Sequence, residues 1–194
     1  MSLTSPVPVA LRPLDEELLR ALLATAVAEA EPREVMPPVE DAAGGAGGNG
    51  AAGPVVWTDA LREAFSRFHR FHSLGPGAPQ RTYAVVVTEP GEDGLPEETV
   101  AGAARLAPRP EPDAVEAGLW LGRSHRGRGV GTRVLALLRE EARRGGAARL
   151  FAGTGSANAA ARRLLSAAGA DLERHADGSV TAWVALVGQR SPTA

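Results

Sequence analysis

Two stretches in the first half of the chain carry apolar side chains at intervals of three and four, the spacing that places them on one face of a helix. The first runs from Leu14 to Glu29, and the second follows a cap at Thr58 or Asp59 and ends near residue 72. The apolar positions of the two faces are Leu18, Leu19, Leu22, Leu23 and Ala26, then Leu61, Ala64, Phe65 and Phe68. A short extended run over residues 8–12 precedes the first helix.

From residue 81 onward the pattern changes to short runs of apolar and β-branched residues, divided by turns rich in Gly, Pro and acidic residues. The runs predict strands over 81–88, 99–106, 115–122, 149–154 and 180–187, the first two forming a hairpin. Helical spacing returns between strands, over 132–144 and 158–168. Helices, antiparallel strands and a β-loop-α-β-α-β tail together indicate a mixed α/β (α+β) fold.

The length of 194 residues fits one globular domain, which we expect over residues 8–190. Residues 41–54 contain six glycines and no large side chain, so they bury too little surface to offset their ordering entropy. We expect a flexible loop there. It interrupts the domain rather than separating two domains, because too few residues precede it to form another core.

Composition excludes several kinds of chemistry. The chain has no Cys, and its 21 basic residues are all Arg, so thiolate catalysis, Cys-ligated zinc and a Schiff-base lysine are ruled out. The net charge is −2 and the charges are scattered, which argues against nucleic-acid binding through a basic stripe. No run approaches the roughly 20 apolar residues of a membrane span, and no signal pattern opens the chain, so we expect a cytoplasmic protein without a membrane partner.

A loop rich in Gly and Arg, residues 123–131, joins the predicted strand over 115–122 to the next helix. Helix N-termini carry unpaired N–H groups and partial positive charge, so they bind anions. Glycines let the loop backbone approach a ligand closely, and arginines add charge. These residues are Gly127, Gly129, Gly131, Arg126 and Arg128. They predict a polyphosphate site, the alternative being a solvated turn that binds nothing.

Residue spacing distinguishes three polyphosphate motifs. A dinucleotide fingerprint would need a third glycine where Thr132 stands, and a P-loop needs a Lys that the chain lacks. The loop does match the pattern R/Q-x-x-G-x-G/A, with Arg126, Gly129 and Gly131 at the fixed positions. In this it resembles the GNAT acetyltransferases.

Neighbouring segments extend the resemblance. In that family the strand before the loop ends in a bulge whose freed backbone groups bind the pantetheine arm, and Gly118–Gly122 is an apolar strand with glycine where a bulge is tolerated. Asn158–Ala170 is similar to a second family pattern, N-x-x-A-x-x-L-Y-x-x-x-G-F. Trp120-Leu121-Gly122 is similar to the branch that contains the ribosomal-protein N-terminal acetyltransferases.

The resemblance implies a GNAT-like fold, a central mixed and mostly antiparallel sheet flanked by helices, with a V-shaped split near Leu121–Gly122 that admits acetyl-CoA. The implied activity moves an acetyl group from acetyl-CoA to a primary amine of a small molecule or a protein N-terminus, without a metal. The implied cofactor contacts are Leu119, Leu121, Arg126, Gly127, Arg128, Gly129, Val130, Gly131 and Asn158. A plain helix cap is the alternative role of Asn158, and the two roles are compatible.

Glu116 is the expected catalytic base, because many family members carry a glutamate near this place on the central strand. Glu111 and Asp113 are weaker alternatives, and a surface carboxylate without a catalytic role is another interpretation of Glu116. The family commonly has a Tyr as general acid in the second pattern, but Leu165 stands there and cannot donate a proton. Either water protonates the leaving thiolate, or the chain has lost activity.

Four other side chains with polar chemistry have simpler interpretations. Tyr83, the only tyrosine, is expected to pack on an early strand or to line the acceptor site. His69 and His72 share a helix face, but without a carboxylate motif we interpret them as exposed helix residues rather than metal ligands. His125 is expected to face solvent beside the loop.

Two other functions stay open at this point. The missing Tyr favours a non-catalytic acyl-CoA-binding or regulatory GNAT-like domain, and a dinucleotide enzyme is a more distant alternative. The expected partners are acetyl-CoA and an amine acceptor. Many family members form homodimers, so the resemblance also implies a homodimer.

Overall fold

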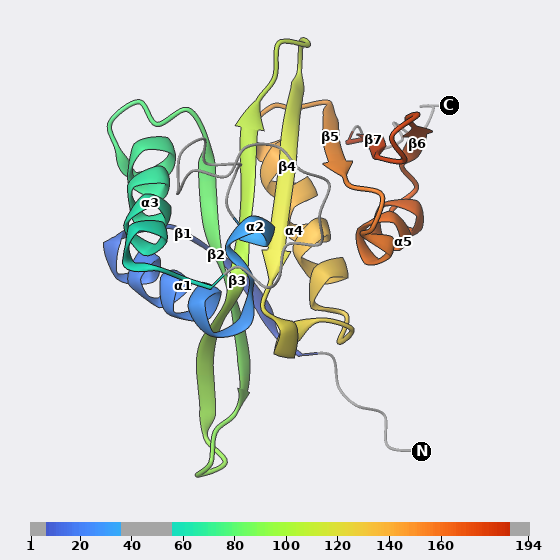
Figure 1. Cartoon of the computed structure of the whole chain (residues 1–194). Helices are drawn as coiled ribbons and strands as arrows, with labels where there is room; N and C mark the ends of the chain where they lie inside the picture. The colour runs from blue at the N-terminus through green and yellow to red at the C-terminus, as the bar shows by residue number, and fades with distance from the viewer. Residues whose placement is uncertain (1–6, 36–55, 187–194) are drawn as a thin grey trace, which may run out of the picture.

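A computed structural model describes residues 7–35 and 56–186 of the protein (Figure 1). Its elements, in chain order, are β1 (Val9–Pro13), α1 (Glu16–Glu29), α2 (Pro32–Val35), α3 (Asp59–His69), β2 (Arg81–Pro90), β3 (Pro96–Pro108), β4 (Ala114–Leu121), α4 (Val130–Arg144), β5 (Arg149–Thr154), α5 (Ala159–Ala167), β6 (Asp171–Arg174) and β7 (Val180–Ala185). A π-helical turn, Arg70–Leu74, continues α3, and a 3-10 turn, Arg123–His125, follows β4.

The strands form one seven-stranded sheet in the order β1-β2-β3-β4-β5-β7-β6. Every neighbouring pair is antiparallel except β4 and β5, which run parallel. A parallel pair needs a crossover connection, and α4 supplies it between these two strands. The expected mixed, mostly antiparallel sheet flanked by helices is therefore confirmed.

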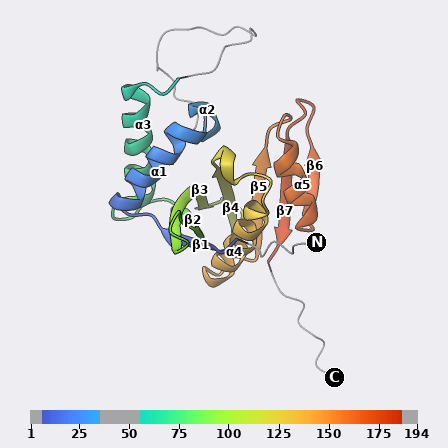
Figure 2. The same ribbon diagram turned by 90° about the horizontal axis from the view of Figure 1, so that it is seen from below.

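Helices cover the sheet on both faces (Figure 2). On one face α1 packs against β2 and β3, and a cluster that includes Leu19, Leu22 and Phe65 joins α1 and α3 to β3. On the other face α4 inserts Val134 and Leu138 among residues of β2–β4, and both side chains are fully buried. Small residues such as Ala104 and Ala117 let α4 approach the sheet closely, which explains how a chain with 4% aromatic residues fills its core.

The residue patterns predicted most element positions but missed two short elements. β5 has the expected bounds, whereas α4 begins at Val130 rather than at residue 132. The four-residue helix α2 and the four-residue edge strand β6 were not predicted. All four residues of β6 are exposed, so this strand leaves no hydrophobic alternation to recognise. The predicted loop over 41–54 lies outside the described residues.

The expected exposure of His69 is wrong. This side chain is 5% exposed, one helical turn from Phe65, and the two rings lie 4.5 Å apart. Phe68 packs against its other side, with ring centroids 5.3 Å apart. Within the described residues neither ring nitrogen of His69 has a hydrogen-bond partner. Burial, with a smaller contribution from nearby positive charges, lowers the pKa of His69 to about 4.

We therefore expect His69 to make the folded protein sensitive to acid. Between pH 6.5 and pH 4 the unfolded chain binds a proton that the folded state excludes, so the free energy of unfolding falls as the pH falls. The full loss is up to about 3 kcal/mol. Urea denaturation of the wild type and of His69→Met across this range measures it, and the variant should show a shallower dependence on pH.

His175→Gln is the control, because His175 lies in the exposed turn between β6 and β7. It should keep the pH dependence of the wild type. Equal slopes for His69→Met and wild type would contradict the assignment of this acid sensitivity to the buried ring.

Candidate functional site

The centre of the sheet opens where β4 and β5 stop pairing. Only Ala114, Val115 and Glu116 of β4 have partners on β5, the last pair being Glu116 with Phe151. β4 continues to Leu121 beside β3, and β5 continues to Thr154 beside β7. The split thus begins directly after Glu116, nearer the start of β4 than the expected position at Leu121–Gly122. Backbone groups of β4 on this side have no strand partner beyond Glu116 in the described chain.

The bulge expected near Gly118 is absent from the pairing of β3 and β4, whose register is continuous from Val115 to Leu121. Gly118 has a different role. A Cβ at this position would lie 2.8 Å from Nε of Arg105, so the glycine lets the Arg105 side chain cross β4. The split itself frees the β4 backbone without a bulge.

The loop after β4 leads into α4 without a side-chain cap. Asp15, Thr58 and Asn158 cap the other three long helices, whereas Gly129 holds this position in α4 and provides no cap. The first N–H bonded within α4 is that of Arg133, which donates to the Gly129 carbonyl. The preceding amides at the helix start are therefore available to an anion.

Positive backbone φ angles explain two of the loop glycines. Gly127 has φ 72° and Gly129 has φ 80°, in the left-handed region that other residues enter at a cost. A Cβ at either position would meet no atom within 4 Å, so conformation and not crowding requires glycine here. The two left-handed residues turn the chain from β4 into the axis of α4.

Both arginines of the loop already have partners. Arg126 donates from Nε to the Leu121 carbonyl at 2.8 Å and from Nη1 to Glu34 at 3.3 Å. Arg128 forms an ion pair with Glu89 at the end of β2. Arg126 thus holds the end of β4 in place. Arg128 can bind an incoming anion if its ion pair with Glu89 breaks.

Glu29, at the end of α1, contacts the same loop. Its Oε2 accepts from the Ser124 hydroxyl at 2.6 Å and from the Ser124 N–H at 2.9 Å. The hydroxyl bond outweighs partial burial and lowers the pKa of Glu29 below its ordinary value. A Cβ on Gly122 would lie 2.6 Å from that oxygen, so this glycine lets the carboxylate reach the end of β4.

Glu116, at the base of the split, lies between two guanidinium groups. Oε1 accepts from Arg105 at 3.0 Å and Oε2 accepts from Arg109 at 3.3 Å. Arg105 also donates to the buried Gln80, and Arg109 lies 3.9 Å above the ring of Phe151. This cluster is on the face of the sheet that carries α1 and α3. The residues that hold these charges in place are Gln80 just before β2, Arg105 of β3, Arg109 just after β3 and Phe151 of β5. The residue pattern of β4 alone does not indicate them.

The two sequence signatures come together at the start of α4. A Cβ on Gly131 would lie 3.7 Å from Leu164 of α5 and 3.8 Å from Leu121 of β4. Asn158 caps α5 by accepting the Ala161 N–H at 3.0 Å. Leu165 is buried against Ala152 and Ala182, so a packed aliphatic side chain occupies the position where the second sequence pattern has Tyr.

Tyr83 lies away from the split, and His125 is more buried than its sequence position indicates. Tyr83 is buried on β2, separated from β4 by β3, and its hydroxyl lies 3.4 Å from Glu141. Its packing role is confirmed. The expected solvent exposure of His125 is wrong, because the side chain is 8% exposed and its Nδ1 is buried without a partner in the described chain.

Among the residues that the structure describes, no group of three His, Cys, Asp or Glu side chains could hold a metal ion. The same residues include no helix long and apolar enough to cross a membrane.

A family model described as the acetyltransferase (GNAT) family matches residues 54–170, more than half of the chain. The match includes β4, the glycine loop, α4 and all of α5. No curated protein matches the chain in sequence.

Solved structures share the fold at low sequence identity. An N-acetyltransferase from Staphylococcus aureus Mu50 is 19% identical, with TM-score 0.56 over 93% of this chain and 99% of that one. The protein yncA from Salmonella typhimurium, solved with its cofactor acetyl-CoA, is 20% identical, with TM-score 0.55 over 96% and 98%. The spermidine/spermine N-acetyltransferase SpeG from Vibrio cholerae is 14% identical, with TM-score 0.59 over 92% and 94%.

Backbone conformation predicts the cost of replacing Gly129. Gly129→Ala should lower the free energy of unfolding by about 1–2 kcal/mol, because alanine must adopt the left-handed conformation while its methyl group meets no clash. Gly155→Ala is the matched control, a loop glycine without positive φ and with open space at its Cβ, and should change stability by less than about 0.5 kcal/mol. Equal urea midpoints for the two variants would contradict the conformational argument.

Proposed function

The chain belongs to the GNAT family of acetyltransferases, and from this premise we propose that it transfers an acetyl group from acetyl-CoA to a primary amine. The observation that carries the proposal is the convergence of a split strand pair with an uncapped, glycine-led helix at Gly131. Acetyl-CoA contains a pantetheine arm that ends in the thioester and a pyrophosphate, and the split strand pair and the helix start suit these two parts respectively.

GNAT enzymes use acetyl-CoA as a co-substrate, and the residues present fit it. The pyrophosphate would be held by the amides of Val130 and Gly131, with Arg128 close by. The pantetheine arm would pair with the free edge of β4 at Leu119 and Leu121, beyond the last partner on β5. Arg126 would act through Leu121, whose carbonyl it fixes, and Gly127 and Gly129 would set the turn.

In the proposed reaction, the amine nitrogen bonds to the thioester carbonyl carbon, the carbon–sulfur bond breaks, and the nitrogen gives up one proton. A backbone N–H near Leu121 would polarise the carbonyl oxygen. Glu116 is the proposed acceptor of the proton, directly or through water, because it lies at the start of the split. Arg105 and Arg109 fix the direction of its carboxylate.

The proton for the leaving thiolate is proposed to come from water. Leu165 has no proton to donate and packs against Ala152 and Ala182. Tyr83 is separated from the split by β3 and cannot replace it. An alkyl thiol has a pKa near 8.5, so the thiolate leaves the carbonyl carbon more readily than an alkoxide would and needs no strong acid beside it. Holding the two substrates together would then supply much of the catalysis.

The acceptor is proposed only as a primary amine on a small molecule or a protein N-terminus. The resemblance of Trp120-Leu121-Gly122 to the ribosomal-protein branch stays a prediction, since the similar structures named above share only the fold. The cytoplasmic location and the homodimer also stay predictions.

Turnover tests the proposal against its alternative. Release of free thiol from acetyl-CoA in the presence of a panel of amines, including peptides with a free N-terminus, would support a transferase. Binding of acetyl-CoA without turnover across the panel would instead support the non-catalytic acyl-CoA-binding domain that Leu165 favours.

Glu116→Gln tests the proposed base. We expect kcat to fall about 100-fold, the lower range of general-base catalysis, with little change in the affinity for acetyl-CoA. Glu111→Gln is the matched control, because Glu111 also pairs with Arg109 but lies outside the split, and its kcat should stay near that of the wild type. A kcat unchanged in Glu116→Gln would contradict the role of Glu116 as the base and leave the fold assignment intact.

Glu89→Gln tests the availability of Arg128. Removing the carboxylate frees the guanidinium, so acetyl-CoA should bind about two- to fivefold more tightly, the range of an exposed ion pair, and the gain should shrink in high salt. Glu97→Gln is the control. Glu97 lies opposite Glu89 in the register of β2 and β3, but it forms no ion pair with Arg128 in the described chain. Weaker binding in Glu89→Gln than in Glu97→Gln would contradict the competition.

A further inference from the structure

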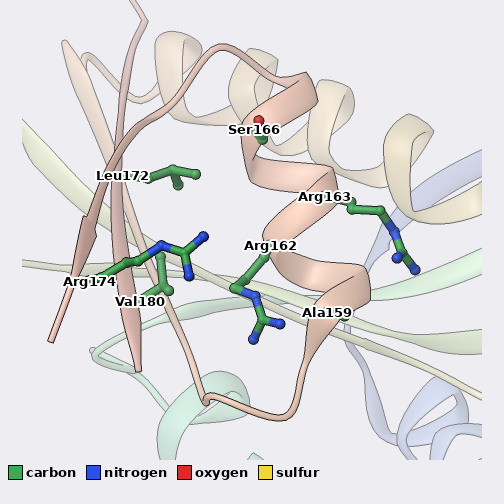
Figure 3. A pocket seen from close by; sticks show the side chains of 7 residues that line it. All are labelled: Ala159, Arg162, Arg163, Ser166, Leu172, Arg174 and Val180. Atoms are coloured by element: carbon green, nitrogen blue, oxygen red, sulfur yellow. The ribbon is translucent and has the colours of Figure 1, made fainter. Parts of the chain in front are cut away.

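A hollow lies between α5 and the last two strands, β6 and β7 (Figure 3). The hollow has a volume of about 330 Å³, which suits a ligand of a few non-hydrogen atoms. Its wall contains three arginines and a serine hydroxyl, and its floor is aliphatic. The lining residues are Arg162, Arg163, Arg174, Ser166, Ala159, Leu172 and Val180.

Two of the arginines extend into the same space. Arg174 reaches from β6 toward α5, and Arg162 reaches from α5 into the same gap, whereas Arg163 extends along the other side of the helix (Figure 3). Arg162 donates to the Ser156 carbonyl. In the described chain Arg174 forms no ion pair and no side-chain hydrogen bond. Two like charges directed into one hollow repel each other, and an anion between them removes that repulsion.

No carboxylate of the surrounding elements serves as that anion. Asp171 and Glu173 alternate with Leu172 and Arg174 along β6, so they project from the opposite face of the strand. Asp177, in the turn that follows, accepts from the N–H and hydroxyl of Ser179. The lining of the hollow therefore has positive charge and no negative side chain.

The aliphatic part of the lining indicates which kind of group carries the anionic head. Leu172 is 41% exposed, although it is a large aliphatic residue, and it borders the hollow with Val180 and Ala159. Guanidinium groups bind carboxylates and phosphates through paired N–H donors. We propose that this hollow binds a small organic anion, a carboxylate or phosphate head on a short aliphatic chain, with the head between Arg162 and Arg174 and the chain on Leu172.

No lining residue of the hollow is among those proposed to hold acetyl-CoA, and the test of the hollow does not require turnover. Hexanoate and inorganic phosphate are the probes, hexanamide is the neutral analogue of hexanoate, and the midpoint of thermal unfolding is the readout. Hexanoate should raise the midpoint of the wild type and hexanamide should not. Arg174→Ala should abolish the response to both anions, and Leu172→Ser should reduce the response to hexanoate alone.

Arg163→Ala is the matched control, because Arg163 also lines the hollow but its guanidinium extends away from Arg162 and Arg174 (Figure 3). It should keep the response to hexanoate. Equal responses in wild type and Arg174→Ala, or no response of the wild type at about 20 mM hexanoate, would overturn the proposal.

The 3′-phosphate of the co-substrate is the other source of such a head group, and a comparison of acetyl-CoA with its 3′-dephospho form distinguishes it. The proposal predicts that Arg174→Ala leaves the affinity ratio of the two compounds unchanged. A ratio that collapses toward one in Arg174→Ala would assign the hollow to the nucleotide and overturn a separate site.

Discussion

The early end of pairing between β4 and β5 is the constraint on which the rest of the site depends. Parallel strands that stayed paired would satisfy each other's backbone groups and leave the centre of the sheet closed. Here the pairing stops after Glu116, and β4 runs on with a partner on only one side. The protein thereby exposes a strand edge in its interior, where a ligand with amide groups can complete the hydrogen bonding.

Contacts from distant segments hold the split and its loop in place. Arg126 fixes the Leu121 carbonyl at the end of β4, and Glu29 of α1 binds Ser124 directly after it. Glu34 of α2 pairs with Arg126 in turn. Helices α1 and α2 are therefore joined by hydrogen bonds and an ion pair to the loop that would hold the polyphosphate.

Sequence patterns predicted the sheet, the long helices and the loop because these depend on local periodicity and on glycine. They failed where a residue's surroundings come from distant strands. The pairing of Glu116 with Arg105 and Arg109 needs β3 and β4 side by side, although an Arg within the apolar run of β3 is a signal that could have been followed. The burial of His69 depends on aromatic neighbours, since helical spacing alone does not say how wide the buried face is.

Isothermal titration of the purified protein with acetyl-CoA, with NAD as comparator, measures whether the split and the glycine loop bind this co-substrate. We expect one acetyl-CoA per chain with a Kd on the order of micromolar, and no heat of binding with NAD. The absence of acetyl-CoA binding, or equal binding of NAD, would contradict the assignment of the split and the glycine loop to this co-substrate.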